Sequence, residues 1–251
     1  MRHDSQRPVR NGIVRRHAAG RAVVLLVLCG VAASPLCALA RGWQRYQSAH
    51  VVLLAPAGQD VTRLLDELER AHADVRAYGL TLRGMISARC YATTADFMSA
   101  SGASAYNLAL ARSGRIHLQP LAVLMRRGEL GRALRHEITH VALESAARRG
   151  LPRWLNEGMA MSVAGEKQPE RLRFARLAQL EDTLARSRRY DNLRSAYGTA
   201  ERLTSALLLA CGRAKVVGLL QAVGAGSGFD AGFRALTGAE PDRWAASRLG
   251  R

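Results

Sequence analysis

Two histidines and a glutamate in the stretch "LRHEITHVAL", residues 134–143, have the types and the spacing that metal chemistry needs. His136 and His140 are four residues apart, so on a helix they lie one turn apart on the same face. Two imidazoles in this arrangement can bind one Zn²⁺, and Glu137 between them can act as a general base on a water molecule. The H-E-x-x-H pattern is short, and a solvated polar helix face is the alternative.

A catalytic zinc site needs a third protein ligand and an open fourth position. The stretch "LPRWLNEGMA", residues 151–160, supplies a candidate. Pro152 favours the start of a second helix, which would carry Glu157 about one turn in and bring its carboxylate back to complete two His and one Glu. Glu144 lies one turn beyond His140, too far along the helix axis to share the metal, so we expect it at the surface or beside a ligand.

The surrounding residues predict the elements that position this site. Upstream, the hydrophobic patterns indicate strands at 50–54, 84–92 and 114–119, with a helix from Asp60 to Gly79 and a shorter one at 94–100. From Leu130 the pattern is helical nearly to the end of the chain, with Gly and Pro as punctuation. The sequence therefore predicts an α+β fold, in which a small α/β half precedes a mostly helical half that carries the zinc site.

The two motifs together, "HEITHVAL…LPRWLNEGMA", resemble the gluzincin zinc metallopeptidases, in particular the peptidase MA-like family, which joins H-E-x-T-H to W-L-N-E-G on the next helix. The similarity covers roughly residues 48–245. It implies a gluzincin-like catalytic domain with Zn²⁺ as cofactor. The residue roles that it implies are His136, His140 and Glu157 as zinc ligands, Glu137 as general base and Tyr197 as a hydrogen-bond donor to the oxyanion. A packing tyrosine is the alternative for Tyr197.

One position departs from the family pattern. Many gluzincins carry an acidic residue four positions after the third ligand, where it supports a zinc-binding histidine; here that position is Met161. Asn156 or Glu144 would have to take that role instead. The resemblance implies hydrolysis of peptide or protein substrates, and strand 114–119 is the candidate edge along which an extended peptide could pair.

The first forty residues differ from the rest. A basic leader with six arginines precedes the uncharged run 22–40, which ends in Ala38-Leu39-Ala40. This order predicts a signal peptide at 1–40, a metallopeptidase domain at 41–251, and an exported protein, periplasmic or secreted. The alternative is an uncleaved N-terminal membrane anchor formed by residues 22–40, because a spanning helix needs about 20 apolar residues.

The chain is strongly basic, with 37 Lys+Arg against 20 Asp+Glu and a formal net charge of +17. The basic residues are scattered and accompany no recognised nucleic-acid module, so we expect no nucleic-acid partner. The charge is compatible with association with a membrane surface or an anionic envelope polymer.

No rival catalytic motif is present: the sequence lacks a G-x-S-x-G elbow, a phosphate-binding glycine loop and a C-x-x-C pair. Two other functions stay open. One is a non-catalytic protein with a structural zinc, and the other is a basic cell-envelope module that binds anionic polymer. Cys90 and Cys211, which remain once the leader is removed, could form one disulfide or be two separate thiols.

Overall fold

The computed structural model describes residues 42–126, 128–147 and 150–249. The predicted signal peptide at 1–40, and its alternative as an anchor at 22–40, lie outside these residues. Within the described ranges no single helix is long and apolar enough to cross a membrane; α7 (Tyr190–Cys211) and α8 (Arg213–Gly224) are long and apolar enough only as a pair, which is bent by 109°.

A five-stranded mixed sheet forms the N-terminal half, with the strand order β1-β2-β3-β5-β4. The strands are β1 (Trp43–Gln47), β2 (Val51–Pro56), β3 (Ile86–Cys90), β4 (Ala109–Arg112) and β5 (Arg115–Leu118). β2, β3 and β5 are parallel to one another, whereas the edge strands β1 and β4 run antiparallel to their neighbours. Burial alternates along β2, where Val51, Leu53 and Ala55 are buried, so one face of the sheet packs against the core.

Three helices accompany the sheet, α1 (Thr62–Ala77), α2 (Thr94–Ser101) and α3 (Leu121–Arg126). The predicted first helix is confirmed as α1, which buries an apolar stripe including Leu64, Leu68 and Val75. Asp60 assists its start, because Oδ1 accepts a hydrogen bond from the backbone N–H of Thr62 at 3.0 Å.

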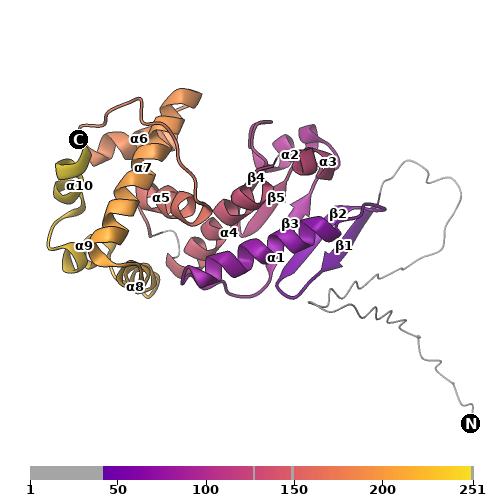
Figure 1. The fold of residues 1–251 in the computed structure, drawn as a ribbon, viewed down its shortest axis with the longest axis horizontal. Coiled ribbons are helices and arrows are strands. Elements are labelled where there is room, and N and C mark those ends of the chain that lie inside the picture. Colours follow the sequence, from indigo (N-terminus) through magenta and orange to yellow (C-terminus); the bar gives the residue numbers. More distant parts are fainter. Residues whose placement is uncertain (1–41, 127, 148–149, 250–251) are drawn as a thin grey trace, which may run out of the picture.

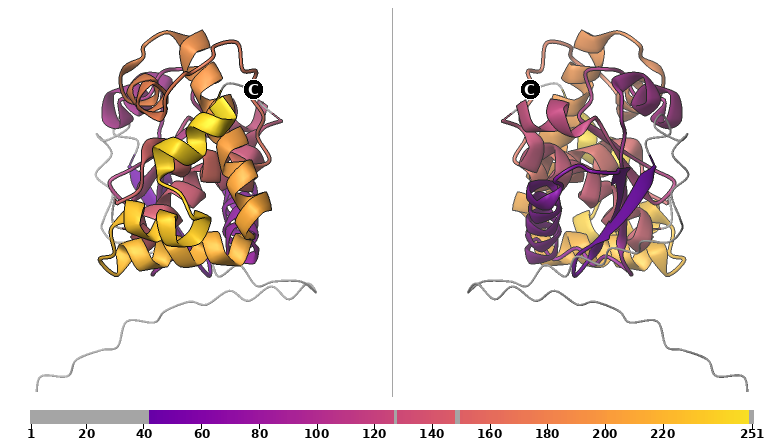
Figure 2. Two further views of the ribbon diagram at one scale, coloured as in Figure 1. Left: turned by 90° about the vertical axis from the view of Figure 1, so that its left-hand side faces the viewer. Right: turned by 90° about the vertical axis from the view of Figure 1, so that its right-hand side faces the viewer.

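The C-terminal half is helical. It contains α4 (Leu130–Ala147), α5 (Arg153–Ala164), α6 (Leu177–Arg186), α7 (Tyr190–Cys211), α8 (Arg213–Gly224), α9 (Phe229–Thr237) and α10 (Pro241–Leu249). Helix α4 lies between the sheet with α1, on one side, and the other helices of the C-terminal half, on the other side (Figure 1). Helices α8, α9 and α10 form the end opposite β1 (Figure 2). The α+β prediction is confirmed.

The assignment of 114–119 as the sheet edge is wrong. β5 lies between β3 and β4, and β4 is the edge strand. A two-residue turn joins β4 to β5, with φ of 52° at Ser113 and 71° at Gly114, as a type I′ hairpin turn requires. β4 was not predicted because it has only four residues, although the Ser-Gly pair that precedes β5 is a turn signal.

Cys90 and Cys211 are both free thiols. Of the two alternatives, a disulfide or two separate thiols, the structure therefore shows the second. Cys90 is fully buried on β3, and burial raises the pKa of its thiol to about 12. At neutral pH it is therefore protonated and unreactive.

Helix α5 is fixed at its N-terminus by side chains from the C-terminal helices. The carboxylate of Glu181 on α6 accepts hydrogen bonds from the backbone N–H groups of Trp154, at 2.7 Å, and Arg153, at 3.1 Å. The ring of Trp154 is fully buried against Phe233 and Trp244, at centroid distances of 6.3 Å from each. These contacts set where α5 begins, and hence where Glu157 lies.

Helices α5 and α7 cross in backbone contact at Gly158. A Cβ atom at this position would lie 2.4 Å from the carbonyl oxygen of Ala200 and 2.0 Å from Oγ1 of Thr204. Real Cβ atoms do not come so close to backbone, so glycine is required directly after Glu157.

We therefore expect Gly158→Ala to destabilise the protein by about 1–3 kcal/mol, because overpacking outweighs the better helix propensity of alanine. Chemical denaturation would measure the change. The matched control is Gly218→Ala in α8, where an added Cβ would have no neighbour within 4 Å. That variant should be more stable by about 0.5–1 kcal/mol. Equal effects at both sites would contradict the close helix crossing.

Candidate metal centre

Helices α4 and α5 bring the three predicted ligands together. Nε2 of His136 and Nε2 of His140 lie 3.0 Å apart. Oε2 of Glu157 lies 3.7 Å from the first nitrogen and 3.4 Å from the second. Ligand atoms of all three residues lie within 4.8 Å of one another, close enough to hold a metal ion.

The triangle of donor atoms fits a zinc ion. Bonds of about 2.0–2.1 Å in a tetrahedral site place neighbouring ligand atoms about 3.3 Å apart, and the three edges lie close to that value. The two imidazole planes are inclined by 71°, so their in-plane lone pairs can converge on one point. Two imidazoles and one carboxylate are also a donor set found in catalytic zinc sites.

The electrostatics of the cluster favour a positive charge between the ligands. Burial opposes protonation of His136, yet contacts with Glu157 and Glu166 raise its pKa well above the ordinary value. Burial also opposes protonation of His140, and the carboxylate of Glu157 raises its pKa. Burial would raise the pKa of Glu157, but the two imidazoles lower it far below its usual range. A divalent cation would take the place of the protons that this cluster attracts.

Glu137 lies beside the ligands but is held by a different element. It is buried, and its Oε2 accepts a hydrogen bond of 2.5 Å from the backbone N–H of Ala111 on β4. One carboxylate oxygen of Glu137 is thus bonded to the edge strand. Glu137 is also not one of the three residues of the donor cluster. This position is consistent with the predicted role of a base, which is not a ligand.

Each ligand histidine has a partner at its other ring nitrogen. Nδ1 of His140 lies 2.6 Å from Oδ1 of Asn156, one of the two residues expected to support a ligand. Nδ1 of His136 is buried without an aligned hydrogen bond, and Oε2 of Glu166 lies 3.3 Å from it as an ion-pair partner. Metal-binding histidines characteristically donate their second N–H to such oxygens, which fixes the ring orientation.

Glu166 was not predicted as a site residue, because it follows α5 and lies outside both motifs. Gly165, with φ of 68°, ends the helix, and the N–H of Glu166 bonds to the carbonyl oxygen of Met161. This is a Schellman ending, which turns the chain back over the helix. Gly165 could be recognised in the sequence as a residue that ends a helix. No pattern predicted that the side chain of the next residue, Glu166, would reach His136.

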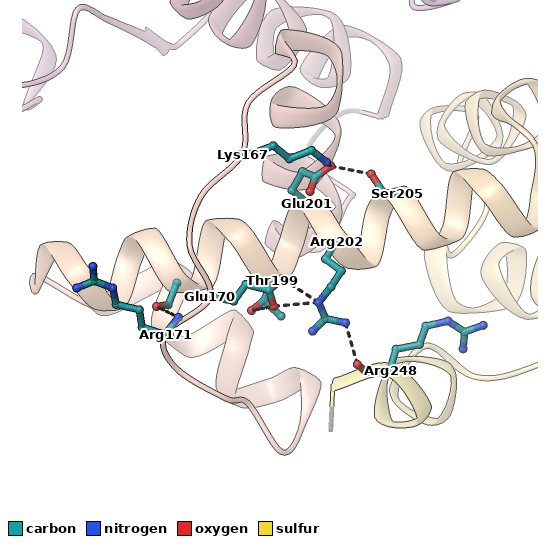
Figure 3. A network of polar contacts seen from close by, with 9 residues as sticks. Lys167, Glu170, Arg171, Thr199, Glu201, Arg202, Ser205 and Arg248 are labelled. Carbon is teal, nitrogen blue, oxygen red and sulfur yellow. Dashed lines mark hydrogen bonds and ion pairs between the residues drawn. The ribbon is translucent and has the colours of Figure 1, made fainter. Parts of the chain in front are cut away.

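We call residues 165–172 the strap, because they run across α7 and are fastened to it by polar contacts (Figure 3). Lys167 pairs with the buried Glu201, and Glu170 accepts hydrogen bonds from Thr199 at 3.0 Å and Arg202 at 2.9 Å. At the point of closest approach, a Cβ on Gly198 would lie 2.5 Å from the carbonyl oxygen of Gln168. The strap therefore holds the backbone beside Glu166 in one place.

The metal centre opens into a cavity of about 1050 Å³, which is also lined by β4, the strap and α7. Tyr197 on α7 lines this cavity, and the carboxylate of Glu157 together with burial raises the pKa of its phenol. The phenol therefore keeps its proton at neutral pH and can donate a hydrogen bond. Its role towards an oxyanion stays a prediction.

Glu144 lines the same cavity but is not part of the donor cluster, as expected from its place on α4. A second group, His50, Glu69 and His72, also has donor atoms within 4.8 Å of one another. Its imidazoles are stacked at 4.1 Å with planes 24° apart, so their lone pairs lie in separate, nearly parallel planes and do not converge on one point. Glu69 is already hydrogen-bonded to Ser48, and to the backbone and Nδ1 of His50. This group fastens the β1–β2 turn to α1 and does not fit a metal.

No protein-family model matches the chain, and a search of curated proteins found no similar protein. The possible metal site therefore rests on the geometry of the described residues.

Removal of the carboxylate of Glu166 should weaken metal binding without abolishing it. We expect Glu166→Ala to lower zinc affinity by about 10–100-fold, because His136 would lose the partner that orients its ring. Competition with a chromophoric chelator would measure the affinity. The matched control is Glu144→Ala, which removes a carboxylate from the same cavity and should leave the affinity unchanged. Equal losses in both variants would mean that overall charge, and not contact with His136, matters.

Proposed function

We propose that this protein is an exported zinc-dependent metallopeptidase. The observation that carries the proposal is the meeting of three zinc-type donors, His136, His140 and Glu157, beside the carboxylate of Glu137 at the wall of a wide cavity. Cavity, donors and carboxylate together are what metal-assisted hydrolysis requires.

The number of donors supports a catalytic zinc over a structural one. Structural zinc sites are closed by four protein ligands, whereas catalytic sites use three and leave a position open. Among the described residues the cluster contains three donors. The two nearby carboxylates are engaged elsewhere, Glu137 by the N–H of Ala111 and Glu166 at the far nitrogen of His136.

A zinc ion held by these residues supplies Lewis acidity, which polarises a carbonyl group and lowers the pKa of coordinated water to about 7. Glu137 then accepts the proton of the attacking water and passes it to the nitrogen of the leaving amine as the C–N bond breaks. Tyr197 donates a hydrogen bond to the oxygen that gains negative charge. Asn156 and Glu166 hold the imidazole rings in orientation.

The peptide would bind along β4. This strand is the edge of the sheet beside the metal centre, Ala109 and Ala111 line the cavity, and the N–H of Ala111 is bonded to Glu137. An extended peptide can add to such an edge through backbone hydrogen bonds. Strand 114–119 was predicted to have this role; its neighbour in the same hairpin replaces it.

Metal analysis of the purified protein combined with digestion of a broad peptide library tests the proposal. We expect about one zinc per chain and cleavage that a chelator abolishes and added zinc restores. Zinc content without cleavage of any peptide would favour a structural site. Salt-sensitive binding of an anionic polymer that survives chelation, again without cleavage, would favour the basic envelope module.

Export rests on the leader sequence, so it has its own test. N-terminal sequencing of the protein recovered from outside the cytoplasm should begin at or near Arg41. An intact N-terminus that fractionates with the membrane would instead identify residues 22–40 as an anchor.

A further inference from the structure

Four arginines from four different elements line the cavity around the metal centre. They are Arg112 on β4, Arg132 on α4, Arg153 at the start of α5 and Arg194 on α7. Since these elements are far apart in the sequence, folding alone brings the four side chains to one opening.

None of the four is neutralised by a carboxylate within the described ranges. Arg112 donates to the carbonyl oxygen of Ser101 at 2.9 Å, and Arg194 donates to Oε1 of Gln168 at 2.9 Å. Neither contact carries negative charge. Lys167 lines the same cavity but is paired with Glu201 (Figure 3), so its charge is already balanced.

Two of the four arginines lie close in the sequence to the candidate metal ligands. Arg132 precedes His136 by four residues on α4, and Arg153 precedes Glu157 by four residues on α5, so each lies one helical turn from a ligand. Arg153 and Tyr197 both line the cavity. A peptide that crosses the metal centre would therefore pass close to guanidinium groups.

Most of the carboxylates in the cavity lining belong to the candidate metal centre. Glu137, Glu157 and Glu166 take part in the contacts described above, and Glu129 and Glu144 are the other carboxylates in the lining. The lining thus holds five carboxylates against the four arginines and Lys167, and a bound divalent cation gives the loaded cavity an excess of positive charge. A cleft with an excess of one charge attracts ligands of the opposite charge and raises their local concentration.

We propose that the substrates are acidic peptides, with Asp or Glu side chains close to the bond that is cleaved. The inference rests on the proposed peptidase function. Guanidinium groups bind carboxylates through two parallel hydrogen bonds, which gives direction as well as charge complementarity. A C-terminal carboxylate offers the same chemistry, but it is one group at one end of a peptide, whereas four arginines line the cavity.

Binding is measured first, apart from turnover. The zinc-loaded Glu137→Gln variant of the full chain is titrated with fluorescent peptides that carry Glu, Gln or Lys at fixed positions, each with a free or an amidated C-terminus. An exposed ion pair changes an equilibrium by up to about fivefold, so engagement of two arginines should give the Glu peptides roughly tenfold tighter binding than the Gln peptides. The difference should shrink as salt is raised.

Charge-reversal variants then locate the effect. Arg132→Glu and Arg153→Glu should lower or invert the preference for Glu peptides in both binding and kcat/KM. The matched control is Arg243→Glu, an exposed arginine on α10 outside the cavity lining, which should keep the wild-type preference.

The outcomes distinguish the proposed peptidase function from the proposed preference for acidic peptides. Preferential binding of Glu peptides without cleavage by the wild-type enzyme would support the preference for acidic peptides and overturn the peptidase. Cleavage with equal kcat/KM for Glu and Gln peptides would keep the peptidase and overturn the acidic preference. A preference that disappears on amidation of the C-terminus would overturn the assignment to side-chain carboxylates.

Discussion

The purified His136→Ala protein is expected to contain almost no zinc, and the same result is expected for His140→Ala. Each substitution removes one corner of a donor triangle whose edges measure 3.0, 3.4 and 3.7 Å. Two remaining protein donors do not make a stable zinc site, because catalytic sites retain three. Elemental analysis after dialysis against a weak chelator would measure the loss.

The third ligand is tested by a matched pair of carboxylates. Glu157→Ala should lose zinc as the histidine variants do, whereas Glu144→Ala should keep about one zinc per chain although it also lines the cavity. Circular dichroism should show that all variants retain their helices, since the ligands line a cavity and are not among the buried hydrophobic core. Zinc loss in Glu144→Ala with retention in Glu157→Ala would mean that the wrong carboxylate has been assigned.

A second large effect is expected for Glu137→Gln, which keeps the shape of the side chain but accepts no proton from water. Hydrolysis of any cleaved peptide should fall by at least about a hundredfold, since general acid–base catalysis typically contributes 10²–10⁴-fold. Zinc content should be unchanged, because Glu137 lies outside the three-residue donor cluster.

The hydrogen bond between Glu137 and the N–H of Ala111 requires a control of its own. The amide of glutamine can still accept the hydrogen bond from the N–H of Ala111 through its oxygen, so β4 should keep its place. Glu137→Ala would also remove that contact, and a lower stability of the alanine variant than of the glutamine variant would reveal its contribution. Retained zinc with undiminished turnover in Glu137→Gln would falsify the role of Glu137 as base.

The sequence predicted the parts of the site that lie on long helices. His136 and His140 share a helix face because of their spacing alone, and Glu157 follows from a helix start at Pro152, where α5 indeed begins with the next residue. The same periodic patterns predicted α1 and the three inner strands of the sheet. Strong local patterns of this kind need no knowledge of the tertiary structure.

What the sequence did not predict depends on tertiary contacts. β4 is too short for a clear alternation, and its place as edge strand follows from the hairpin turn at Ser113 and Gly114. Glu166 reaches His136 only because the Schellman ending redirects the chain and α7 holds the strap. A side chain beyond a helix end has no periodicity that could identify its partner.

The contact at Gly158 has a consequence for how the protein tolerates mutation. The spacing between α5 and α7 is set by backbone touching backbone, and no rotamer change or repacking of a side chain can alter it. Exchanges among the large apolar residues of the helical half should therefore lower stability well before they displace Glu157 from the two histidines. The apolar residues of the core can therefore change while the donor triangle is kept. Gly158 is the position at which substitution is not tolerated.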